Sequence, residues 1–182
     1  EISSGIFAYD GTAVAAERVR ITGTAGFGVS LRKNTRVRLD DAEIVSTRGP
    51  GIQATKGSAL MLDGVTLEDC SDIGVAIDAE TQVEATDLHI IGVSASSAGQ
   101  GVGIQVNETS SAELRDFSIE GAIQTALEMI AGITAPGPTV VTLENGTLRG
   151  SRVGIRSLLN PTRDSFTATH VRLSGNLADF DP

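Results

Sequence analysis

Carboxylate side chains are the residues of this sequence best suited to chemistry, because Asp and Glu together number 23 whereas His numbers 2. Two carboxyl groups about 5–10 Å apart can cleave a glycosidic bond, one as acid and the other as base or nucleophile. Asp40 and Asp41 are adjacent in the chain, so their side chains diverge. Asp78 and Glu128, by contrast, fall on one surface, because a repeat in the sequence places both on the same face of a sheet.

The positions of the histidines and of the cysteine in the sequence favour neither a metal site nor a cysteine nucleophile. His89 and His170 lack the spacing of metal ligands, so we expect no metal site. Cys70 is the single cysteine and cannot form an internal disulfide. Without a His placed beside it, we expect a semi-buried thiol rather than a nucleophile.

Composition and charge narrow the classes of partner. The 182 residues carry a net charge of −9, and such a chain is a poor nucleic-acid binder because phosphate neutralisation supplies most of that affinity. No apolar stretch approaches the roughly 20 residues of a membrane helix. The length predicts one domain, residues 1–182. The chain shows no signal segment, so we expect it to be a mature or excised part of a longer protein. The excess of Arg over Lys hints at a bacterial source.

A glycine followed by an aliphatic residue recurs along the chain, first at Gly5-Ile6. The intervals between successive occurrences are 23, 23, 23, 29, 23 and 28 residues, and a period of this length is typical of stacked repeats. The later members are Gly28-Val29, Gly51-Ile52, Gly74-Val75, Gly103-Ile104, Ala126-Leu127 and Gly154-Ile155.

Apolar residues return within each repeat in three alternating pairs, one and three, nine and eleven, and fourteen and sixteen residues after the glycine. Alternation with a period of two predicts strands with one buried face. One repeat cannot bury that face alone, so the repeats must stack, and we expect Ile77 and Val106 in one inward column. The sequence therefore predicts an all-β fold, a parallel β-helix of about seven coils of ~23 residues with three strands in each coil.

The coil length, the three strand pairs and the short second turn resemble the right-handed parallel β-helix superfamily typified by pectate lyases, over nearly the whole chain. A leucine-rich repeat is the nearest alternative, but its Asn or Cys ladder and helical return segment are missing. The second turn is polar, and Asp, Asn and Gly tolerate the left-handed backbone of a tight turn. We expect this ladder to be structural, with calcium binding as the alternative and no other cofactor. Its members are Asp40-Asp41, Asp63-Gly64, Thr86-Asp87, Arg115-Asp116 and Glu144-Asn145.

The resemblance implies that a carbohydrate site would lie on the outer face of the first sheet, whose strands follow the repeat glycines. Amides, hydroxyls and single charges form a polar stripe on this face, which suits sugar hydroxyl groups and equally suits a solvated sheet. Asp78, Glu128 and Arg32 are also the candidate catalytic residues, although Asp78 and Glu128 lie two coils, or ~10 Å, apart. The expected ligand-binding residues are Tyr9, Arg32, Gln53, Asp78, Gln105, Asn107 and Glu128.

Two insertions, residues 93–100 and 131–138, break the period and flank this stripe. Loops on a rigid scaffold often carry function, so each is either a groove wall or a tolerated insertion. The outer face of the second sheet is expected to be a mixed surface with no insertion beside it. Its residues are Ala15, Arg38, Met61, Glu84, Glu113 and Thr142.

These observations favour an extracellular or cell-surface module that is adhesive, glycan-binding or structural, without evident catalytic machinery. The alternative is a carbohydrate-active enzyme, a polysaccharide lyase or glycoside hydrolase, acting on the outer face of the first sheet. The expected partner is a polysaccharide or a cell-surface glycan, and neither nucleic acid nor a transmembrane segment is expected. The tail after Leu173 is too short for a cap, so we also expect self-association or a flanking segment at a coil end.

Overall fold

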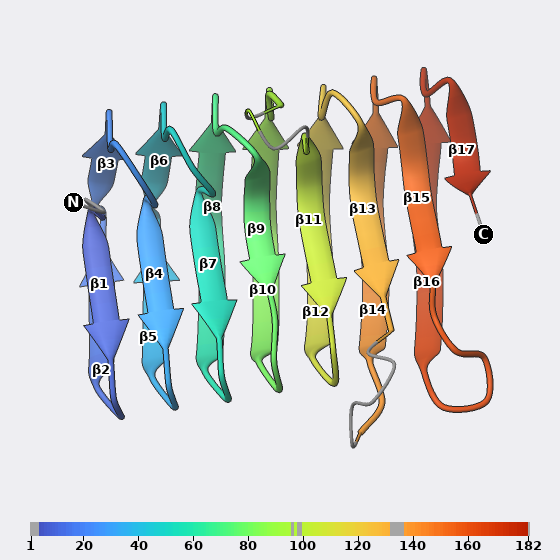
Figure 1. The fold of residues 1–182 in the computed structure, drawn as a ribbon. Helices are drawn as coiled ribbons and strands as arrows, with labels where there is room; N and C mark the ends of the chain where they lie inside the picture. The colour runs from blue at the N-terminus through green and yellow to red at the C-terminus, as the bar shows by residue number, and fades with distance from the viewer. Residues whose placement is uncertain (1–3, 96, 98–99, 132–136, 182) are drawn as a thin grey trace.

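The structure is a computed structural model that describes residues 4–95, 97, 100–131 and 137–181. Within these residues the regular secondary structure is entirely β-strand, and the strands pair in parallel. Successive coils lie side by side along one axis (Figure 1), which confirms the predicted stacking. The strands are β1 (Ile6–Tyr9), β2 (Ala13–Glu17), β3 (Arg20–Thr22), β4 (Val29–Arg32), β5 (Arg36–Asp40), β6 (Glu43–Val45), β7 (Ile52–Thr55), β8 (Ala59–Glu68), β9 (Ile73–Ile77), β10 (Gln82–Ile91), β11 (Val102–Asn107), β12 (Ser111–Glu120), β13 (Thr125–Ile130), β14 (Val140–Arg149), β15 (Val153–Leu158), β16 (Ser165–Ser174) and β17 (Ala178–Asp181).

Two sheets enclose the core. The first sheet has the order β1-β4-β7-β9-β11-β13-β15-β17, and its strands run downward at the front of Figure 1. The second sheet has the order β16-β14-β12-β10-β8-β5-β2, with β3 and β6 extending it beside β8. The predicted second and third strands are separate in the first two coils, but from β8 onward they join into one ten-residue strand. We call the residues before and after its bend the first and second halves of each long strand.

The bend between the two halves is the predicted tight turn. Asp41, Asp87 and Asn145 have φ angles of 51°, 53° and 53°, in the left-handed region. This confirms why Asp, Asn and Gly recur there, since they adopt that backbone at low cost. The column also includes Arg18 and His170, at 54° each, whose residue types did not signal a turn.

The repeat glycines are explained by the close approach of the next coil. A Cβ on Gly74 would lie 2.5 Å from the carbonyl oxygen of Gly103 and 2.9 Å from Ile90 Cγ2. Glycine is needed in this column for lack of space and not for its backbone freedom, because the φ angles of these glycines are not positive. Ala126 occupies the column in one coil, so a methyl group is accommodated there. The glycines whose Cβ would lie 2.5–2.8 Å from a carbonyl oxygen of the next coil are Gly5, Gly28, Gly51, Gly74, Gly103 and Gly154.

The inward columns form one aliphatic core. Ile77 and Val106 are fully buried and are register partners on β9 and β11, which confirms the predicted column. Phe117 adds an aromatic ring, and a Cβ on Gly146 would collide with that ring. The core is less protected in the terminal coils, where its half-buried members are Ile6, Val14, Ala16, Val19, Phe166, Val171 and Leu173.

The tail after Leu173 contains a strand that the sequence analysis did not predict. β17 continues the first sheet by pairing with β15, with Ala178 opposite Val153 and Phe180 opposite Ile155. Phe180 remains 51% exposed, and coverage of a coil end by another segment or copy stays a prediction.

The two predicted insertions lie partly outside the described residues, at positions 96, 98–99 and 132–136. Val93 is buried in the core. The first insertion therefore starts after Val93 rather than at it, because this aliphatic side chain packs with the coil.

A loop over residues 159–164 connects β15 to β16, and Asp164 anchors it. The Asp164 carboxylate, whose side chain is fully buried, accepts hydrogen bonds from the backbone N–H groups of Thr139 (2.9 Å) and Asn160 (2.8 Å). Arg163 pairs with it at 3.0 Å. Burial alone would raise the pKa of Asp164, but the hydrogen bonds from Arg163 and the two N–H groups outweigh burial and lower it.

We expect Asp164→Asn to lower Tm at pH 7 and to weaken the acid sensitivity of the fold. Because the pKa of Asp164 is lower in the folded state, its stabilising contribution is complete above the unfolded pKa of about 3.9. It is lost as the pH falls through the folded pKa. Circular dichroism melts from pH 7 to pH 2.5 measure this. The control is Asp116→Asn, at an exposed turn position; equal acid responses of the two variants would contradict the prediction.

Candidate functional site

The outer face of the first sheet carries the predicted polar stripe, but the middle of the stripe is buried. Gln105 is 7% and Glu128 8% exposed. Next to them, Ile73, Ala76 and Val102 form a small apolar cluster separate from the main core. The central side chains are therefore held by packing, which differs from the solvated surface that the alternation pattern alone predicts.

A chain of polar contacts crosses four coils on this face. Asn107 Nδ2 donates to Gln105 Oε1 (3.2 Å), and Gln105 Nε2 donates to Glu128 Oε2 (2.7 Å). Arg156 contacts Glu128 Oε1 (3.4 Å) and Asp181 Oδ2 (3.3 Å). The structure thus brings together three of the expected ligand-binding residues, joins them to Arg156, which the repeat places on the same stripe, and adds Asp181. Asp181 was missed because its strand was not predicted.

Asp78 stands apart from this chain. It follows the end of β9, and in the described residues no contact joins its carboxylate to that of Glu128. Strand β11 lies between their coils, which corresponds to a separation of about 10 Å along the axis. Both Glu128 oxygens already accept a hydrogen bond, so this carboxylate is arranged to hold its neighbours in place.

The N-terminal end of the same face carries aromatic rings and cations. Phe7 and Tyr9 are nearly parallel, with 6.3 Å between ring centroids and 9° between planes, and both are exposed. Arg32 donates to Gln53 Oε1 (3.2 Å) and lies 5.9 Å from the ring centroid of Phe27. Tyr9, Arg32 and Gln53 were predicted, whereas Phe27 was missed because it precedes the repeat glycine rather than following it.

Lys33 extends this group. Its ammonium lies 5.2 Å from the Tyr9 ring centroid and 2.8 Å from Asp10 Oδ1. The hydrogen bond and the charge of Asp10 raise the pKa of Lys33, so the group stays cationic beside the ring.

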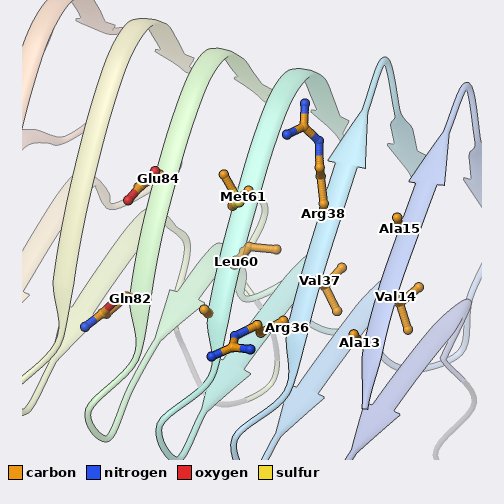
Figure 2. Close-up of a pocket in the computed structure, with 11 residues that line it drawn as sticks. Ala13, Val14, Ala15, Arg36, Val37, Arg38, Leu60, Met61, Gln82 and Glu84 are labelled. Carbon is orange, nitrogen blue, oxygen red and sulfur yellow. The ribbon is translucent and has the colours of Figure 1, made fainter. Parts of the chain in front are cut away.

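A hollow of about 450 Å³ lies on the outer face of the second sheet, over β2, β5, β8 and β10 (Figure 2). It arises because short and long side chains alternate between neighbouring coils: Ala13, Arg36, Ala59 and Gln82 are register partners. Alanine ends at Cβ, so the longer side chains rise as walls around it. The outward-facing lining residues are Ala13, Ala15, Arg36, Arg38, Ala59, Met61, Gln82 and Glu84.

The two arginines of this hollow differ in their partners. Arg38 donates to Asp40 at 2.7 Å, and this hydrogen bond raises the pKa of Arg38. Arg36 is exposed, and within the described chain its guanidinium has no side-chain partner. The sequence predicts a mixed surface on this face, without a hollow. The signal that could have identified the hollow is the alternation of Ala13, Arg36, Ala59 and Gln82 down one column.

A family model described as a right-handed β-helix region matches residues 4–172. The chain belongs to the right-handed β-helix family. Neither a curated protein nor a solved structure matches it. Membership agrees with the parallel coils described above and with the handedness that the resemblance implied.

Among the described residues of this right-handed β-helix, no group of three or more His, Cys, Asp or Glu is placed to hold a metal ion. Calcium binding at the acidic turns stays a prediction. The described part of the chain also contains no helix with the length and apolar character needed to cross a membrane.

Cys70 differs from its prediction as a semi-buried thiol. It is fully buried in the core of the β-helix. Burial raises the pKa of the thiol, and the hydrogen bond of Thr47 only partly opposes that effect. The thiol is therefore a packing group, because the thiolate form is disfavoured in an apolar core.

Proposed function

We propose that this β-helix is a binding module for a polysaccharide or cell-surface glycan, working at an extracellular or cell-surface location. Its exposed aromatic pair carries the proposal. The chain has only five Phe, one Tyr and no Trp, yet Phe7 is 59% and Tyr9 49% exposed, side by side on the first sheet. Exposed rings of this kind stack on the apolar faces of sugars.

Polar groups beside the rings suit the hydroxyl groups of the same ligand. Arg32 and Gln53 lie on the two following coils and are hydrogen-bonded to each other, which limits their side-chain freedom. Side chains that are already ordered lose less entropy when they bind a ligand. Planar amide and guanidinium groups then select the orientation of sugar hydroxyls, and the rings supply contact area.

Catalysis on this face has weaker support than binding. Glu128 is engaged at both oxygens, and its coil is two coils from that of Asp78. The enzyme alternative nevertheless makes a specific prediction, which is product formation that disappears in Arg32→Ala or Asp78→Ala.

We expect the double variant Phe7→Ala, Tyr9→Ala to weaken glycan binding at least about fivefold. Each stacked ring contributes about 0.5–1.5 kcal/mol, and about 1.4 kcal/mol corresponds to a tenfold change. Affinity electrophoresis against a panel of neutral and acidic polysaccharides, with and without calcium, measures binding. Ultraviolet absorbance and reducing-end assays on the same mixtures measure product formation.

The matched control is Phe180→Ala, which removes an exposed Phe at the other end of the same sheet. It should leave binding intact. Equal losses in both variants, or no binding to any polysaccharide, would refute the proposal. Loss in Arg36→Ala alone would instead place the ligand in the hollow of Figure 2.

A further inference from the structure

A serine, a histidine and an aspartate form a continuous hydrogen-bonded chain on the outer face of the second sheet. His89 Nδ1 lies 2.8 Å from Ser118 Oγ, and His89 Nε2 lies 3.0 Å from Asp87 Oδ1. The contacts lie in the second halves of β10 and β12 and at the bend of β10, away from the glycan face. We propose that Ser118, His89 and Asp87 form a nucleophile site that hydrolyses carboxylic esters. This inference does not depend on the proposed glycan binding.

The hydrogen bonds determine which atom carries each proton. An ionised carboxylate can only accept, so His89 Nε2 must carry a hydrogen and donate it to Asp87. When the ring is neutral, Nδ1 is then the unprotonated nitrogen, and Ser118 donates its hydroxyl hydrogen to it. A serine that donates to a histidine, which is in turn oriented by a carboxylate, is the arrangement that activates a serine nucleophile.

The backbone holds these residues in a fixed relation. His89 and Ser118 are register partners on adjacent parallel strands. Asp87 occupies the left-handed turn position of its coil, with a φ of 53°. His89 and Asp87 retain 43% and 60% side-chain exposure, so the ring can be reached by a substrate from solvent.

A hollow on the other side of Ser118 can receive that substrate. It has a volume of about 380 Å³ and spans β12, β14 and β16. Thr147 is the register partner of Ser118 in the next coil, and Arg172 is the partner of Thr147 in the coil after. The lining residues are Ser118, Glu120, Thr147, Arg149, Arg172 and Ser174.

The donors in this hollow indicate the substrate class. Arg149 is paired with Glu120 at 2.6 Å. In the described chain, Thr147 Oγ1 and the guanidinium of Arg172 have no side-chain partner. Thr147, one coil from Ser118, would donate its hydroxyl hydrogen to the ester carbonyl oxygen as that oxygen gains negative charge, and Arg172 lies one coil further along. The geometry therefore suits an ester whose acyl part carries a carboxylate at its far end.

The reaction balances with water as the second reactant. Ser118 Oγ forms a bond to the ester carbonyl carbon while its proton passes to His89 Nδ1. The bond from that carbon to the alkoxy oxygen then breaks, and the leaving alcohol takes the proton from Nδ1. Water next attacks the carbonyl carbon of the acyl-serine and gives a proton to Nδ1. That proton passes to Ser118 Oγ as the bond between the carbon and Oγ breaks and the carboxylic acid leaves.

The test uses the full chain with two probes, 4-nitrophenyl acetate and the mono-4-nitrophenyl ester of succinic acid. Release of 4-nitrophenolate gives the rate, and peptide mass spectrometry locates the acyl group. We expect acylation at Ser118, and rates at least tenfold lower in Ser118→Ala and His89→Gln. Asp87→Asn should lower both rates several-fold, and Arg172→Ala should reduce the succinate-to-acetate rate ratio at least threefold.

The matched control is His170→Gln, which removes the other histidine, at the turn position of a later coil. Its rate, compared with that of the wild type, measures how much an isolated imidazole contributes to hydrolysis. We expect no contribution, so this variant should retain the full rate. A melting curve for each variant establishes that it is folded. Wild-type hydrolysis no faster than that of Ser118→Ala, or an acyl group found only on other residues, would overturn the inference.

Discussion

Ile77→Asp is expected to leave the β-helix unfolded at 25 °C. Ile77 is fully buried between Ala54 and Val106, its partners in the coils on either side. An uncompensated charge at such a position costs about 3–5 kcal/mol, and loss of the buried Ile side chain costs about 2–5 kcal/mol more. Together these costs are comparable with the total stability of about 5–15 kcal/mol of a typical domain. Loss of the far-ultraviolet β signal and of the cooperative urea transition would measure the effect.

The control for Ile77→Asp makes the same chemical change at an exposed site. Ile91 is 41% exposed at the end of β10, and surface substitutions away from special features usually change stability by less than about 0.5 kcal/mol. Ile91→Asp should therefore melt close to the wild type. A soluble Ile77→Asp chain with an unchanged melting curve would mean that the register of β9 is wrong.

Gly74→Val is expected to destabilise the fold by about 3 kcal/mol or more, at the upper end of overpacking effects. Its Cβ would lie 2.5 Å from the Gly103 carbonyl oxygen and 2.9 Å from Ile90 Cγ2, and the branched side chain adds two further methyl groups. The backbone oxygen cannot move without breaking contact with the next coil. Urea denaturation at constant pH gives the difference in unfolding free energy.

Ala126 provides the comparison for the glycine column, because it already carries a Cβ in that column. Ala126→Gly should destabilise by only about 1–2 kcal/mol, through backbone entropy and the loss of one buried methyl group. If Gly74→Val were as stable as the wild type, the steric explanation of the repeat glycines would fail.

The sequence predicted the features that depend on contacts between equivalent residues of neighbouring coils. Ile77 and Val106 stack because each lies three residues after its repeat glycine, so alignment on the glycines pairs them even across an interval of 29 residues. The left-handed turn at Asp87 was predictable for a similar reason, since the residue type reflects the local backbone.

The features that the sequence did not predict depend on side-chain length and on short segments. Gln105 and Glu128 were placed on the correct face, but their burial depends on how neighbouring side chains fold over them. The hollow beside Arg36 arises from differences in side-chain length between coils, which an inward–outward pattern does not record. β17 has only four residues, and Asp179 stands where the other coils have the repeat glycine or alanine, so neither the repeat nor alternation identifies this strand. The contact of His89 with Ser118 depends on the orientation of two outward side chains, which their position in the repeat does not record.

Because the coils stack along one axis, each coil is stabilised only by its own contacts and by those with the coils directly before and after it. Each strand of the first sheet pairs only with its immediate neighbours, so the folding free energy approximates a sum of coil terms and nearest-neighbour interface terms. Damage in a terminal coil removes one interface and leaves the remaining stack intact. Damage at the coil of Ile77 removes two interfaces and divides the stack into two shorter, separately weaker blocks. The effect of a local substitution on unfolding of the whole stack therefore depends on its position along the axis. It is greatest in the middle coils and smallest in the terminal coils, where the core columns are half-exposed.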